Sequence, residues 1–147
     1  MKATDFLKKQ HREVEALFGK VLKSDAPKER KSLAAEISDK LEVHTTIEEE
    51  IFYPAYRESA TTKKGEDLVL EAYEEHHVVK MVLAELPKVD ASAENFEAKM
   101  TVLKELIEHH VEEEEKEMFP DAEKKLGKEH LDELAEAMEK RASQLTR

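Results

Sequence analysis

The 147-residue chain contains no cysteine, no tryptophan, and only three glycines and four prolines. The absence of cysteine excludes disulfide bonds, thiol catalysis and iron–sulfur clusters held by thiolates. Glycine and proline are the residues that interrupt helices, so their scarcity beside abundant Glu, Lys, Leu and Ala predicts an all-helical protein. The length corresponds to one domain that is large enough to bury a substantial core.

Long apolar runs are also missing. No run approaches the ~20 residues that cross a bilayer, and the first ten residues lack the apolar core of a signal peptide. Acidic residues outnumber basic ones 35 to 24, and the net charge is −11. Such a charge disfavours nucleic acid and anionic membranes as partners. We therefore expect a cytoplasmic protein that binds neither; the sequence does not identify a protein partner.

One stretch of the chain occurs twice, as HTTIEEEIFYP over residues 44–54 and as HVEEEEKEMFP over residues 110–120. In both copies three residues separate a histidine from a glutamate, and five more separate that glutamate from a proline. A His and a Glu four positions apart lie on one face of a helix, one turn apart. Two such helices facing each other would direct two imidazoles and two carboxylates to a shared point, which predicts a metal site with two ions.

Apolar residues at alternating steps of three and four predict four long helices joined by short connections. We expect breaks at 24–27, 59–65 and 87–93, a stop at Gly127, and a kink or an end of the second helix at Pro54. The predicted fold is therefore all-α: an antiparallel up-down-up-down four-helix bundle over residues 1–126. Residues 127–147 would form an additional C-terminal amphipathic helix packed on the bundle.

Each predicted helix carries one histidine in its apolar seam, and two seams also carry a glutamate: His11, His44, Glu48, His76, His110 and Glu114. Singly, a core histidine is usually a hydrogen-bonded structural residue, and a glutamate in a charge run is usually solvated. Together, six polar residues in one layer, with no Lys or Arg on the seam, leave the cost of burying two carboxylates uncompensated. A bound cation would compensate it, so we interpret the six residues as metal ligands.

The same periodicity separates the adjacent histidines, because the seams favour His76 over His77 and His110 over His109. One step along a helix turns a side chain by about 100°. We therefore expect that the neighbours of the seam residues can be replaced without loss of metal: His77, His109, Glu49 and Glu115.

Counting donors indicates which metal the six residues suit. Two octahedral ions have about twelve coordination positions, of which four histidines and two bridging carboxylates fill about eight. The remaining positions suit an oxo or hydroxo bridge and an exchangeable ligand. Mixed imidazole and carboxylate donors with open positions favour two non-haem iron ions, with manganese as an alternative, whereas zinc usually takes four ligands.

These motifs resemble the hemerythrin-like family, also called the HHE cation-binding domain. The resemblance covers roughly residues 4 to 125 and is carried by Gln10-His11, 44–48 with Phe52-Tyr53-Pro54, Glu75-His76, and 110–114 with Phe119-Pro120. It implies that His11 and His44 serve one iron and His76 and His110 the other. It also implies that Glu48 and Glu114 bridge the two irons, and that the ligand is a small diatomic molecule or peroxide.

The sequence departs from the oxygen-carrying hemerythrins at two positions. Ala72 stands where they have a fifth histidine, and Glu114 follows its histidine by four residues where they have an aspartate at five. Tyr73 is a candidate residue near the site, although an ordinary interfacial tyrosine is the favoured interpretation. The resemblance implies a di-iron protein that binds or reacts with dioxygen, peroxide or nitric oxide, and leaves open whether it is an enzyme with catalase-like or peroxidase-like activity. The alternatives are an iron-handling or iron/oxygen-sensing module that acts through a partner, and a metal-free interaction bundle.

Overall fold

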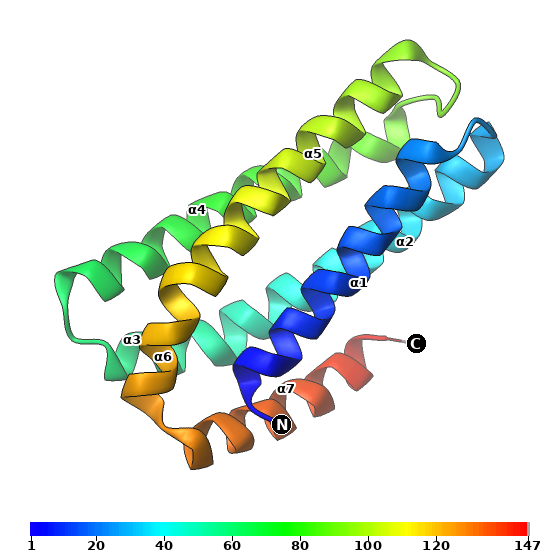
Figure 1. The fold of residues 1–147 in the computed structure, drawn as a ribbon. Coiled ribbons are helices and arrows are strands. Elements are labelled where there is room, and N and C mark those ends of the chain that lie inside the picture. The colour runs from blue at the N-terminus through cyan, green and yellow to red at the C-terminus, as the bar shows by residue number, and fades with distance from the viewer. Residues whose placement is uncertain (147) are drawn as a thin grey trace.

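Four long helical rods lie side by side, each antiparallel to the next, in a computed structural model that describes residues 1–146 (Figure 1). The first rod is α1 (Ala3–Lys23), and the third is α4 (Lys63–Glu85) with a 3-10 turn (Leu86–Lys88). The second rod consists of α2 (Pro27–Ile47), a π-helical segment (Glu48–Phe52) and α3 (Tyr53–Ser59). The fourth consists of α5 (Glu94–Glu113), a second π-helical segment (Glu114–Met118) and α6 (Phe119–Leu126). The additional helix α7 (Lys128–Leu145) follows. The predicted up-down-up-down bundle with a C-terminal helix is confirmed.

The helical path continues through Pro54 and Pro120, because a π-helical turn precedes each proline. The Tyr53 N–H donates to the Glu48 carbonyl, and the Phe119 N–H donates to the Glu114 carbonyl, both across five residues. Proline has no N–H and its ring clashes with the preceding turn of an α-helix. The wider π turn accommodates one extra residue and avoids that clash. The expectation that Pro54 could end the second helix is therefore wrong.

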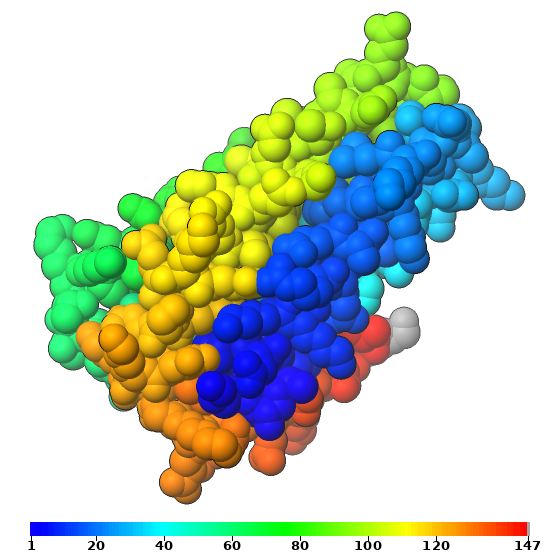
Figure 2. All heavy atoms as spheres, viewed as in Figure 1, coloured from blue at the N-terminus to red at the C-terminus, as the bar shows by residue number. Residues whose placement is uncertain are grey.

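The apolar core forms two clusters, one toward each end of the bundle. The cluster nearer the 24–27 and 87–93 connections is built on large side chains that include Phe18, Ile37, Phe96, Met100 and Leu103. The cluster at the opposite end includes Leu7, Phe52, Tyr53, Phe119 and Leu131. Figure 2 shows α1 and α5 packed side by side, so that this face of the bundle is closed by side chains over the interior.

Helix α7 folds back against the bundle and packs on α1 and α2 (Figure 1). Gly127 makes the reversal possible with a φ of +80°, a backbone conformation that glycine adopts without steric cost. Leu131, Ala135 and Met138 form the buried face of α7, and Arg141 pairs with Glu50 of the first π-helical segment at 2.8 Å. Within residues 1–146, no helix is both long and apolar enough to pass through a membrane.

Candidate metal centre

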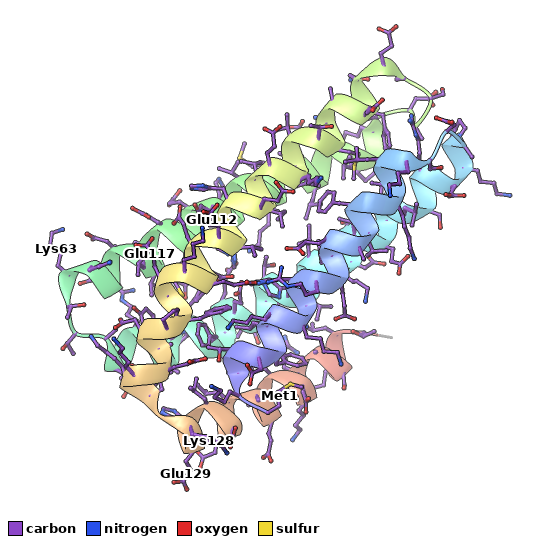
Figure 3. The ribbon with its side chains drawn as sticks, viewed as in Figure 1. Met1, Lys63, Glu112, Glu117, Lys128 and Glu129 are labelled. Atoms are coloured by element: carbon purple, nitrogen blue, oxygen red, sulfur yellow. The ribbon has the colours of Figure 1, made fainter. Side chains whose placement is uncertain are left out.

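The six predicted seam residues meet in one layer between the two apolar clusters, and none has more than 5% of its surface exposed. One histidine comes from each of α1, α2, α4 and α5, and the two glutamates are the first residues of the π-helical segments. Figure 3 shows side chains that extend from the rods into the space between them. The helical periodicity thus placed all six side chains on inward faces.

The six side chains divide into two overlapping groups with spacing suited to metal ions. The first contains His11, His44, Glu48 and Glu114, and the second contains Glu48, His76 and His110; within each group the candidate ligand atoms lie within 4.8 Å of one another. Glu48 Oε1 lies 3.2 Å from His44 Nε2 and 3.1 Å from His76 Nε2. Glu114 lies 3.1 Å from His11 Nε2 through Oε1 and 3.3 Å from His110 Nε2 through Oε2. Each carboxylate therefore spans the two pairs of histidines.

Four buried polar atoms in this layer have no hydrogen-bond partner: His11 Nε2, His44 Nε2, Glu48 Oε2 and Glu114 Oε1. An unsatisfied buried polar atom costs roughly 1–3 kcal/mol, and more when the group is charged. No Lys or Arg within residues 1–146 forms a salt bridge with Glu48 or Glu114. Imidazole nitrogens and carboxylate oxygens are donors to metal ions, so the residues present fit a bound cation.

The charges of the layer depend on one another. Burial would lower the pKa of His110, but the Glu114 carboxylate beside it raises that pKa well above the ordinary 6.5. Burial would raise the pKa of Glu48, but the charge of His44 and hydrogen bonds within the layer bring it well below the ordinary 4.5. Without metal, the raised pKa values of His11 and His110 favour protonated imidazoles, whose charge balances the carboxylates. Metal binding has to displace these protons.

The metal-free protein should therefore lose stability as the pH rises above neutral. A histidine with a raised pKa stabilises the fold fully below its unfolded value of 6.5, and this contribution is lost as the pH rises through the folded pKa. The contribution of Glu48, whose pKa is lowered, is present above 4.5 and lost as the pH falls. Thermal unfolding of chelator-treated protein at about pH 5.5 and at about pH 8.5 measures the change. The metal-loaded protein should show the opposite trend, and identical trends would contradict this account.

Each of the four histidines is also held from outside, through Nδ1, by a residue next to another ligand in the sequence. His44 contacts Gln10 Oε1 at 2.6 Å, while His11, His76 and His110 contact Glu115, Glu49 and Glu75 at 2.7 Å each. A carboxylate on the far nitrogen fixes the tautomer and orientation of a metal-binding imidazole, and its loss typically costs about 10–100-fold in metal affinity. The expectation that Glu49 and Glu115 can be replaced with little effect is therefore corrected. A residue next to a ligand turns away from its own helix seam but reaches the histidine of the neighbouring helix.

Tyr53, rather than Tyr73, is the tyrosine in the site. The fully buried Tyr53 hydroxyl donates to Glu114 Oε2 at 2.6 Å and lies 3.1 Å from Glu48 Oε1. It also lies 3.2 Å from the Nε2 atoms of both His76 and His110. Tyr73 packs edge-on against Tyr53 and donates to the Glu49 carbonyl at 3.3 Å, so it supports the site without entering it. The sequence signal for Tyr53 was its position within the repeated motif, directly before Pro54.

A small cavity of about 20 Å³ adjoins all four histidines. The remainder of its lining includes Val14, Leu41, Val79 and Ile107, each one turn from a histidine on the side away from the glutamates. A cavity of roughly 10–15 Å³ is enough for one water molecule. The cavity thus has room for one very small molecule, in mostly apolar surroundings beside the candidate metal ligands.

Comparisons with known proteins identify a matching family and a similar fold. The family described as the hemerythrin HHE cation binding domain matches residues 2–122. The crystal structure of an HHE cation binding domain-containing protein from Mycobacterium kansasii, a Rv2633c homolog, is similar with a TM-score of 0.84 and 29% identity, over 99% of this chain and 87% of that one. The uncharacterized protein Rv2633c of Mycobacterium tuberculosis is 31% identical over 99% of this chain and 88% of its own length. A DNA nickase from Nostoc sp. is 27% identical over 92% of this chain, which spans only 37% of that protein.

Proposed function

Because this chain belongs to the hemerythrin HHE cation-binding family, we propose that its buried centre holds two non-haem iron ions and reacts with dioxygen, peroxide or nitric oxide. His11 and His44 would hold one ion, His76 and His110 the other, and Glu48 and Glu114 would bridge them. Manganese is the alternative metal, since it accepts similar donors. Bound iron would supply open coordination positions and redox chemistry at neutral pH.

The observation that carries the proposal is the set of four unsatisfied buried atoms on two histidines and two carboxylates. A merely structural polar layer would pair these atoms with one another or with a fixed cation. Here both carboxylates face histidine nitrogens from two sides at 3.1–3.3 Å, yet one oxygen of each carboxylate, Glu48 Oε2 and Glu114 Oε1, has no hydrogen-bond partner. That arrangement supports a pair of ions with shared carboxylates.

The chain's own residues would control what reaches the centre and where protons are held. The small volume and mostly apolar surroundings of the 20 Å³ cavity would admit only a very small ligand and would exclude bulk water. Burial, together with Glu114 and Glu48, raises the pKa of Tyr53 well above the ordinary 10.0, so its hydroxyl keeps its proton in the metal-free protein. That proton lies beside both carboxylates and two histidines.

The direct test is metal analysis and spectroscopy of protein purified from iron-replete cells. We expect about two iron ions per chain, an absorption band from an oxo or hydroxo bridge, and a spectral change on adding peroxide or nitric oxide. Protein that contains no iron after iron loading, or iron-loaded protein that responds to neither reagent, would rule the proposal out.

Replacing Tyr53 with phenylalanine should alter the centre without emptying it. Tyr53→Phe removes a donor to a buried carboxylate, which should destabilise the metal-free protein by about 1–3 kcal/mol. Iron should still bind, but with a changed absorption spectrum and a changed rate of reaction with peroxide. Denaturant unfolding, iron content and stopped-flow absorption measure the three effects.

Tyr56→Phe is the matched control for this variant. Tyr56 is also fully buried, and its hydroxyl donates at 2.6 Å to Asp121, a residue outside the metal layer. The Tyr56→Phe variant should lose stability in the same way, but it should keep the absorption spectrum and the rate of reaction with peroxide of the unaltered protein. Equal spectra and rates in the two variants would show that the Tyr53 hydroxyl has no part in the chemistry.

A second candidate function is iron or oxygen sensing through a partner, which the contact of α7 with the first π-helical segment favours. Glu50, two residues after Glu48, is paired with Arg141 of α7 at 2.8 Å. A change at the centre could therefore alter how firmly α7 is held. Hydrogen exchange of α7 with and without iron, in the unaltered chain and in Arg141→Gln, tests this link. Rapid peroxide turnover with unchanged α7 protection supports the enzyme, whereas metal-dependent protection without turnover supports the sensor.

A further inference from the structure

A second group of side chains of the types that bind metals lies at the surface beside the centre. It consists of Glu75 on α4 and of His109 and Glu113 on α5, whose ligand atoms lie within 4.8 Å of one another. His109 Nε2 lies 2.5 Å from Glu113 Oε1 and 3.5 Å from Glu75 Oε2. The His109 side chain is 67% exposed, while both carboxylates are largely covered. An imidazole and two carboxylates therefore converge where solvent has access.

The charges of this group differ from those around the other outer glutamates. Glu49 is paired with Lys80 at 2.9 Å, and Glu115 is paired with Arg12. Glu75 and Glu113 have no Lys or Arg at salt-bridge distance in the part of the chain that the structure describes; both face His109, and Glu75 also contacts His110 Nδ1. The fixed cation present beside the other two glutamates is thus missing here, and two carboxylates with one imidazole form a ligand set for a divalent cation.

The group is connected to the buried centre in two ways. Glu75 contacts His109 through Oε2 and the centre's His110 Nδ1, at 2.7 Å, through Oε1. A narrow cavity of about 10 Å³ is lined by Glu75 and Glu113 together with His110 and Glu114. The small side chain of Ala72 also lines this cavity. Two carboxylates of the surface group and two candidate ligands of the buried centre therefore line one cavity.

We propose that Glu75, His109 and Glu113 form a surface site that takes up a divalent cation and passes it inward to the buried centre. The transfer rests on the proposed function, because it needs a centre that receives the ion. Three protein ligands at an exposed position hold a cation less tightly than the buried set, which allows the ion to leave. Glu75 would bind the ion with the same carboxylate that orients His110.

Cobalt(II) binding to the metal-free full-length chain tests the site, because Co²⁺ accepts the same donors and its absorption reports coordination. We expect about three Co²⁺ per chain in the unaltered protein and about two in His109→Ala and in Glu113→Gln. Filling of the buried centre at limiting Co²⁺, followed by stopped-flow absorption, should slow by about tenfold or more in both variants. Their final occupancy of the buried centre should remain that of the unaltered protein.

Two control variants separate the site from general surface charge. His77→Ala removes another exposed histidine, from α4, and Glu112→Gln removes an exposed carboxylate on α5 that pairs with Lys116 (Glu112 is labelled in Figure 3). Both should keep the third ion and the filling rate. The proposal is overturned if His109→Ala binds as many Co²⁺ ions as the unaltered chain, or if it fills as fast. Failure of the di-iron proposal would look different, because no variant would then fill the buried centre.

Discussion

Replacing Glu114 with glutamine is expected to reduce the iron content from about two ions per chain to less than one. Glutamine keeps the size of the side chain but removes its charge and one acceptor oxygen. Glu114 reaches His11 at 3.1 Å through one oxygen and His110 at 3.3 Å through the other, so both histidine pairs lose a shared anion. Glu48→Gln should have the same effect, because Glu48 spans His44 and His76. Iron per chain after identical loading measures the loss.

A graded series of variants in the same run of glutamates tests this prediction. Glu115→Gln should weaken binding by about 10–100-fold through loss of the His11 contact, and should therefore lie between Glu114→Gln and the unaltered chain. Glu112→Gln should bind iron normally, since its carboxylate is exposed and paired with Lys116. An iron content of Glu114→Gln equal to that of Glu112→Gln would show that Glu114 is not a metal ligand.

Removal of the metal should lower the melting temperature by roughly 8–16 °C. A ligand at about 1,000 times its dissociation constant stabilises the folded state by about 4 kcal/mol. One kcal/mol corresponds to about 2–4 °C for a domain of this size. The effect should be large here because four buried atoms of the layer lack other partners. Calorimetry of the iron-loaded protein before and after treatment with a chelator measures the shift.

Glu114→Gln treated with the same chelator provides the control for this shift. If the stabilisation comes from the buried centre, the variant should show little further loss, because it holds little iron to remove. Equal shifts in the variant and the unaltered chain would mean that the chelator acts elsewhere. No shift in the unaltered chain would mean that the bundle does not depend on metal.

The helical period was enough to predict the fold. It was also enough to predict that six residues far apart in the sequence meet at one point. His11, His44, His76 and His110 lie in seams of otherwise apolar residues, and a step of four residues keeps each glutamate beneath its histidine. The same rule distinguished adjacent histidines, because His77 and His109 are exposed where their neighbours are buried. These features depend on local geometry, which sequence spacing describes well.

The contacts that the sequence did not predict depend on departures from that geometry or on neighbouring helices. In an α-helix five residues turn through about 500°, which would place Tyr53 away from Glu48. The π turn joins the Tyr53 N–H to the Glu48 carbonyl across those five residues and brings the tyrosine under the glutamate. The outer glutamates were missed for another reason. Glu49 and Glu75 turn away from their own seams and contact histidines of other helices, and one helix's spacing contains no information about its neighbour.

The duplicated motif makes the centre nearly two-fold symmetric, but exceptions to the symmetry make its two halves chemically different. Exchanging α1 and α2 with α4 and α5 maps the contacts of each histidine onto those of another. Two positions break the exchange: Phe119, which stacks on His11, stands where the other half has Tyr53, and Gln10 stands where the other half has Glu75. The half around His110 thus has an additional carboxylate and a hydroxyl, and the half around His11 has an amide and a phenyl ring. Two ions of the same element would therefore experience different electric fields, and a small molecule bound between them would meet two unlike ends.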